Sequence, residues 1–106
     1  MIPMGFVSPT GTFYECDYQG HSVLADKLCD SLYPDEEYIW PSDFLVEHGW
    51  AQISMTMFLD HRVIIFHEDN KPWTIPQKEF FQPYKEELKK WMSEYEYNQF
   101  LEDIEL

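Results

Sequence analysis

The sequence predicts one α+β domain: a small antiparallel sheet of three or four strands, two short helices and a long C-terminal helix. The chain has 106 residues, which suits a single domain. Runs rich in aromatic and β-branched residues occur in two pairs, each joined by a turn, as in β-hairpins. The helical stretches show no βαβ repetition, so we expect antiparallel strands with the helices on one face of the sheet.

The first hairpin is predicted from residues 4–7 and 12–16. The connecting residues 8–11 include Pro9, which presets φ, and Gly11, which tolerates positive φ. These residues favour a tight turn between two short strands.

Two short helices are expected next. Ser22 is a suitable N-cap for a helix over 22–32, and Ser42 for a second helix that Gly49 ends. The expected buried side of the first helix consists of Val23, Leu24, Leu28, Ser31 and Leu32.

The second hairpin is predicted from residues 50–55, where apolar and polar residues alternate, and residues 62–66, which are almost wholly apolar. Thr74 is then expected to cap a short helix over 76–82, which Pro83 interrupts. A main helix follows from residue 84, as an acidic extension over about 84–106. Its apolar stripe has helical spacing and consists of Tyr84, Leu88, Trp91, Met92 and Tyr95.

The net charge excludes several partners. The chain has 20 Asp and Glu against 7 Lys and Arg, a formal charge of −13. Such a molecule is repelled by nucleic acid and by anionic lipid. Its N-terminus shows no signal peptide, and no run approaches the length of a membrane span. We therefore expect a soluble, cytoplasmic protein with no direct contact to nucleic acid or membrane.

The sequence contains no convincing catalytic or metal-binding motif. Cys16 and Cys29 lack the close pairing of zinc ligands, and we expect both to be reduced thiols. His61 and His67 lie at opposite ends of a predicted strand, too far apart to share a metal. With only 4 glycines and no phosphate-binding loop, the chain is expected to hold no cofactor and to be no enzyme.

Two stretches resemble small uncharacterised proteins of Gram-positive bacteria and their phages: residues 5–14 (GFVSPTGTFY) and residues 43–50 (DFLVEHGW). The similarity extends in scattered pieces over residues 5–82. It implies a phage or prophage gene expressed in a bacterial cytoplasm, and it brings no catalytic motif with it. The segment from Lys85 departs from the pattern by being longer and more acidic.

Acidic and aromatic residues together indicate two candidate binding segments. No Lys or Arg occurs between Leu28 and His61, and none after Lys90. Carboxylates on a folded surface can imitate a row of phosphates, although the same acidity also serves solubility. The candidate partner-binding residues are Asp35, Glu36, Glu37, Tyr38 and Trp40 in the first segment, and Glu94, Glu96, Tyr97, Phe100, Glu102 and Asp103 in the second.

These features predict a binding protein: a phage or prophage product that inhibits a bacterial host protein with a basic surface, such as a defence or nucleic-acid-handling enzyme. One alternative is a regulatory or assembly subunit, self-associating as a homodimer through Leu88, Trp91 and Tyr95. Another is a protein that sequesters a small ligand in an aromatic pocket.

Overall fold

A four-stranded antiparallel sheet forms the centre of the molecule. The computed structural model describes residues 4–17, 19–55, 63–67 and 71–105. The strand order is β2-β1-β3-β4, and every neighbouring pair is antiparallel. The predicted antiparallel sheet and both predicted hairpins are confirmed. The strands are β1 (Gly5–Val7), β2 (Phe13–Glu15), β3 (Ala51–Met55) and β4 (Val63–Phe66).

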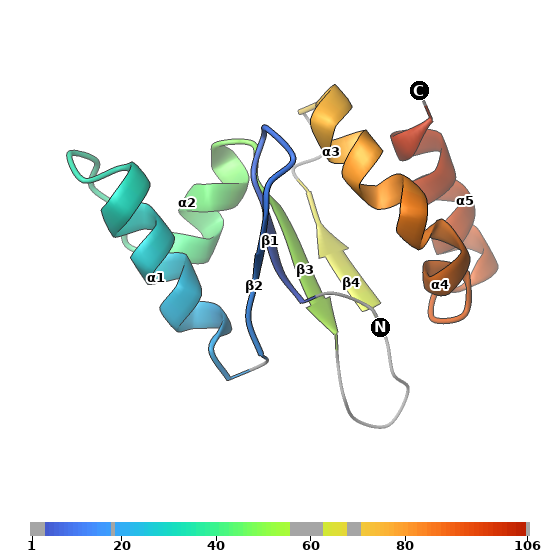
Figure 1. Ribbon diagram of the computed structural model, residues 1–106, viewed down its shortest axis with the longest axis horizontal. Helices are drawn as coiled ribbons and strands as arrows, with labels where there is room; N and C mark the ends of the chain where they lie inside the picture. Colours follow the sequence, from blue (N-terminus) through green and yellow to red (C-terminus); the bar gives the residue numbers. More distant parts are fainter. Residues whose placement is uncertain (1–3, 18, 56–62, 68–70, 106) are drawn as a thin grey trace.

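Helices cover both faces of this sheet, so the prediction that they share one face is wrong (Figure 1). One layer contains α1 (His21–Leu32) and α2 (Pro41–Glu47). The other contains α3 (Ile75–Phe81), the 3₁₀ turn η1 (Gln82–Tyr84), α4 (Lys85–Lys89) and α5 (Glu94–Ile104).

Neighbouring residues of β1 explain the two layers. Phe6 packs with Leu45 and Trp50 on the α1–α2 side, while Val7 packs with Phe81 on the side of α3 to α5. Adjacent strand residues point to opposite faces, and both Phe6 and Val7 are 0 % exposed. The sheet therefore has two hydrophobic cores, one on each side.

The buried side of α1 differs from the predicted one. Ala25, Leu28 and Cys29 face the sheet, whereas Val23 and Leu32 are 55 % and 47 % exposed. Both predicted serine caps are also wrong. The N-cap of α1 is Gly20 rather than Ser22, and that of α2, which begins at Pro41, is Trp40 rather than Ser42, each without a side-chain cap. Proline favours the first helical position, since its missing N–H is one that the helix leaves unbonded.

The predicted Thr74 cap of α3 is confirmed. The Thr74 hydroxyl accepts from the Gln77 backbone N–H, and the Gln77 side chain accepts from the Thr74 N–H, a capping box. The Thr74 hydroxyl also donates to the Pro9 carbonyl at 2.7 Å, and the buried Gln77 amide donates to the Gly49 carbonyl. These bonds fix α3 to the turn of the first hairpin and to the start of β3.

The long C-terminal helix is divided in two. A turn over residues 90–93 separates α4 from α5, which begins where the Ser93 hydroxyl accepts from the Glu96 N–H at 3.2 Å. The predicted apolar stripe is therefore not one surface: Leu88 is 2 % exposed in the core, whereas Tyr95 is 74 % exposed. Phe100 and Ile104 of α5 pack in the same core as Leu88.

Candidate functional site

The connection from α1 to α2, residues 33–40, is held close to α1. We call it the α1–α2 segment. The Tyr33 N–H donates to the Cys29 carbonyl at 2.8 Å and closes the helix. The Tyr38 hydroxyl donates to the Asp30 carboxylate, and the Cys29 thiol to the Pro41 carbonyl at 3.5 Å. Both ends of the segment are thus tied to the last turns of α1.

Two large apolar side chains project from this tied segment into solvent. Ile39 is 85 % exposed and Trp40 is 69 % exposed. Trp40 has extended backbone angles, φ −119° and ψ 100°, and lies directly before Pro41, whose ring restricts the residue that precedes it. The fold therefore presents both side chains from a backbone that is already ordered.

Aromatic packing connects the segment to the core. The Tyr38 ring lies 5.4 Å from the Phe44 ring, which in turn lies 5.3 Å from the Tyr33 ring. The Trp50 indole N–H donates to the Tyr33 hydroxyl at 3.1 Å. Tyr38 consequently serves as a support, whereas Ile39 and Trp40 remain available for contact.

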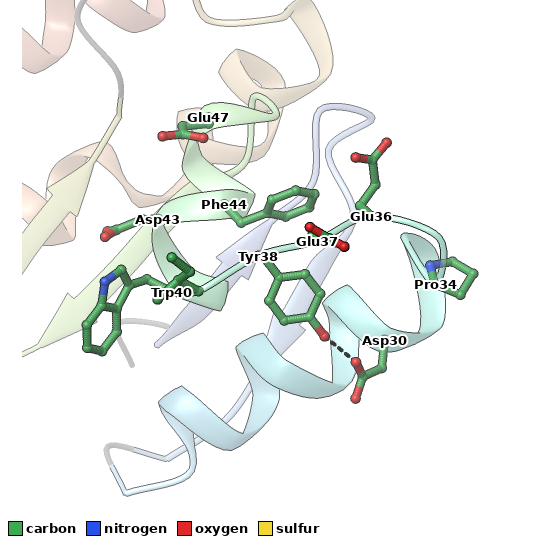
Figure 2. A pocket seen from close by; sticks show the side chains of 10 residues that line it. Asp30, Pro34, Glu36, Glu37, Tyr38, Trp40, Asp43, Phe44 and Glu47 are labelled. Atoms are coloured by element: carbon green, nitrogen blue, oxygen red, sulfur yellow. Dashed lines mark hydrogen bonds between the residues drawn. The ribbon is translucent and has the colours of Figure 1, made fainter.

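Carboxylates surround a hollow of about 820 Å³ beside the segment. Figure 2 shows Tyr38 reaching across to Asp30 while Trp40 points away from it. Asp43 and Glu47 are four residues apart on α2, which places them on the same side of that helix. We call this the acidic–aromatic surface, made of Asp30, Glu36, Glu37, Tyr38, Ile39, Trp40, Asp43 and Glu47.

Few positive charges balance this surface. Residues 15–50 contain nine carboxylates and one lysine, Lys27, whereas residues 63–106 contain ten carboxylates and five lysines. The hydrogen bond to Asp30, together with its negative charge, raises the pKa of Tyr38 to about 12. Tyr38 is therefore a neutral hydrogen-bond donor throughout the physiological pH range.

The structure brings the first predicted segment together and separates it from the second. Glu36, Glu37, Tyr38 and Trp40 line one hollow, with Asp35 exposed in the same segment. The second set lies on α5, beyond the opposite face of the sheet (Figure 1). It comprises Glu94, Glu96, Tyr97, Phe100, Glu102 and Asp103.

Phe100 is not a surface contact, which corrects its predicted role. It is 4 % exposed, with its ring 5.6 Å from that of Phe81 in an edge-on arrangement. Tyr97 is half-buried and lies under the Lys89 ammonium, 5.9 Å from the ring centre. Only the carboxylates of this second set remain freely exposed, apart from Glu96, which accepts from the Ser93 hydroxyl at 2.9 Å.

Several surface residues were missed by reasoning from the sequence. The contribution of Asp30 as the acceptor for Tyr38 depends on a chain reversal that local patterns do not encode. Val23 and Asp26 line a second hollow beside Trp40. Their spacing with Asp30, i, i+3 and i+7, places all three on one side of α1 and is a signal that was available.

The cysteines and histidines have structural surroundings. Burial raises the pKa of the Cys16 and Cys29 thiols, which keeps both protonated near neutral pH. The His21 ring stacks on Phe6, with centres 4.5 Å apart, and its Nδ1 lies 3.3 Å from the Gln52 amide nitrogen. Among the described residues, no group of three His, Cys, Asp or Glu side chains is placed to hold a metal ion. His61 lies outside the described residues.

Comparisons with family models, curated proteins and solved structures found no match to this chain. Within the parts of the chain that the structure describes, no helix has the length and apolar character needed to cross a bilayer. The acidic–aromatic surface is therefore the feature of this chain from which a function can be inferred.

Proposed function

We propose that this protein is a non-enzymatic binding protein that docks on the basic surface of another protein through its acidic–aromatic surface. The observation that carries the proposal is the adjacent pair Ile39 and Trp40, exposed at 85 % and 69 % on a tied backbone among carboxylates. Exposed tryptophan is enriched among the residues that dominate binding energy at interfaces.

Two physical contributions favour binding through this surface. The carboxylates attract a basic partner over long range and accelerate the encounter, an effect that salt weakens. The apolar pair then contributes buried area after docking, and the ordered backbone limits the entropy lost on binding.

A basic surface on a protein commonly serves to bind nucleic acid, and an acidic protein seated there would exclude it. We further propose that the target is a cytoplasmic protein of a bacterial host. We therefore propose inhibition by occupation of a nucleic-acid-binding surface.

Affinity capture with matched variants tests this proposal. The tagged full chain is incubated with a Gram-positive bacterial lysate at low and high salt. Trp40→Ser removes the anchor and places a preferred capping residue before α2. Its control is Tyr95→Ser, which removes an aromatic residue of similar exposure, 74 %, from α5.

Charge is tested with a second matched pair. Glu36→Gln/Glu37→Gln neutralises two consecutive glutamates of the acidic–aromatic surface, and Glu86→Gln/Glu87→Gln does the same on α4. Glu102→Gln/Asp103→Asn tests the carboxylates of α5.

We expect one basic partner, retained by wild type and by the variants on α4 and α5 but lost with Trp40→Ser and weakened by Glu36→Gln/Glu37→Gln. Nucleic-acid binding by the isolated partner should fall when the protein is added. Equal capture by all variants, or no capture at low salt, would contradict the proposed function.

A further inference from the structure

A second hollow, of about 660 Å³, lies along Trp40 between α1 and α2. Val23 of α1 and the exposed side chains of Ile39 and Trp40 give it apolar walls. Asp26 of α1 and Asp43 of α2 add carboxylates. The hollow therefore combines an aromatic face and aliphatic wall with two acidic groups from different helices.

This combination fits a long side chain with an apolar stem and a positive end. Such side chains lay their methylene groups along apolar surface while the charged end remains paired or solvated. The lining contains no lysine or arginine among the described residues that could neutralise Asp26 and Asp43. The chemistry of the hollow is thus complementary to a cation delivered from outside.

Arginine suits the hollow better than lysine. Its planar guanidinium stacks on an aromatic face and forms paired hydrogen bonds with a carboxylate, whereas an ammonium is compact and strongly hydrated. Tryptophan is the side chain that binds cations most strongly through its ring face. The exposed indole and the neighbouring carboxylates supply both kinds of contact.

We propose that the hollow beside Trp40 binds an arginine side chain from a basic segment of the partner, with the guanidinium stacked on the indole and paired with Asp26 or Asp43. The proposal rests on the docking function argued above and names its recognition element. A second copy of this chain does not fit, because each copy has a charge of −13 and the sequence has one arginine, Arg62.

Titration of the ¹⁵N-labelled full chain with three short blocked peptides tests the proposal by NMR. The peptides are tetra-arginine, tetra-lysine and the uncharged tetra-citrulline. The chain has four tryptophans, and the Trp40 indole signal is assigned by its loss in Trp40→Ser.

We expect saturable shifts of the Trp40 indole N–H and of the Val23, Asp26 and Asp43 amides. Tetra-arginine should bind about threefold to tenfold more tightly than tetra-lysine, and tetra-citrulline should not bind. Asp26→Asn should weaken tetra-arginine binding, while Asp103→Asn on α5 should leave it unchanged.

Equal affinity for both cationic peptides, with shifts spread evenly over the carboxylates of α5, would overturn the proposal in favour of nonspecific ion binding. Trp40→Ser could abolish capture of the partner while tetra-arginine causes no shifts of the signals from the hollow. Recognition of arginine would then be wrong, but the docking surface would stand, with an apolar side chain of the partner in the hollow. If tetra-arginine binds in the hollow but Trp40→Ser captures the partner as well as wild type does, the proposed function is wrong instead.

Discussion

The α1–α2 segment and α5 have similar mixtures of acidic and aromatic residues, yet the fold uses them differently. Ile39 and Trp40 remain exposed, whereas Phe100 and Ile104 of α5 are 4 % and 1 % exposed. In α5 the apolar residues recur at helical spacing and share one buried side. Tyr38 to Trp40 are consecutive, and in non-helical backbone consecutive side chains point in different directions. A segment rich in acidic and aromatic residues is therefore a candidate docking surface only where its apolar residues lack helical spacing. With helical spacing, they share one side of a helix and pack into the core.

Charge separates the two regions as well. In the layer of α3 to α5, lysines occur from α3 to the turn after α4. There the Lys78 ammonium donates to the Glu105 carbonyl at 3.3 Å, and Lys90 pairs with Glu87 at 3.5 Å. The layer of α1 and α2, residues 21–47, has seven carboxylates and one lysine, Lys27. Uncompensated charge on a folded surface lowers stability by self-repulsion. The α1–α2 layer therefore has two destabilising features, the charge repulsion and the exposed apolar side chains of Ile39 and Trp40.

The largest expected difference between the two regions is in folding stability. Phe100→Ala should lower the free energy of unfolding by about 3–5 kcal/mol, because it leaves a cavity in the core. Trp40→Ser should lower it by less than about 0.5 kcal/mol, as for most surface substitutions, and the serine at the N-cap of α2 offsets part of that loss. Urea unfolding followed by circular dichroism measures both.

Because Phe100→Ala removes a large share of the stability of a small domain, the milder Phe100→Leu gives a folded comparison. A Trp40→Ser variant that loses as much stability as Phe100→Leu would show that Trp40 belongs to the core. The acidic–aromatic surface would then lack its anchor.

Acidification should loosen the α1–α2 layer through His21. Burial against Phe6 lowers the pKa of His21 below its ordinary value of 6.5. The unfolded chain therefore binds this proton more readily, and the contribution to stability is complete above pH 6.5 and declines as the pH falls below it toward the folded pKa.

Urea midpoints between pH 7.5 and 5 for wild type and for His21→Gln measure this effect. Wild type should lose more stability over that range, and hydrogen exchange should rise more in α1 than in α5. Identical pH dependence in the two proteins would exclude His21 as the cause.

Much of the fold could be predicted from local patterns. The first hairpin follows from its turn residues, the second from the apolar patterns of its two strands, and the start of α3 from the Thr74 cap. All three signals act over a few positions. The division of the C-terminal helix was also encoded locally, since Ser93 and Glu96 have the spacing of a capping box.

The two-sided burial of the sheet was harder to predict. It depends on which elements pack against β1, a strand of only three residues, all of them buried. The candidate surface was predicted through Tyr38 and Trp40, but the carboxylate that fixes Tyr38 was not. The bond to Asp30 spans eight residues and a chain reversal, so no single periodicity connects the two residues.

Neutralising charge should have a smaller effect, and only in the α1–α2 layer should it raise stability. Glu36→Gln/Glu37→Gln should raise Tm by about 1–3 °C at low salt, because it relieves repulsion worth a few tenths of a kcal/mol. Glu86→Gln/Glu87→Gln should lower Tm slightly or leave it unchanged, since Glu87 pairs with Lys90. Thermal unfolding at low and high salt measures both, and a salt-independent result would show that repulsion is not the cause.

The smallest expected effect on stability at neutral pH concerns the bond between Tyr38 and Asp30, which fixes the segment before the exposed pair. This hydrogen bond is the main cause that raises the pKa of Tyr38 from the ordinary 10 to about 12. Folding therefore favours the neutral phenol. The contribution is complete below pH 10 and is lost as the pH rises toward 12. Tyrosinate absorbance is followed as the pH is raised, and the curve of Tyr38→Phe is subtracted from that of wild type. The difference should show one tyrosine that ionises late. In Asp30→Ala the pKa of this tyrosine should return toward 10.

At neutral pH the same bond should favour docking, because it keeps the backbone that carries Ile39 and Trp40 ordered. Tyr38→Phe retains the ring contact with Phe44 and removes only the hydroxyl. Partner affinity should therefore fall by about twofold to tenfold, because the loosened segment must be ordered on binding. ¹⁵N relaxation of the Ile39 and Trp40 amides should report faster local motion in this variant. Unchanged relaxation and affinity would assign the order of the segment to Pro41 and the aromatic packing rather than to Asp30.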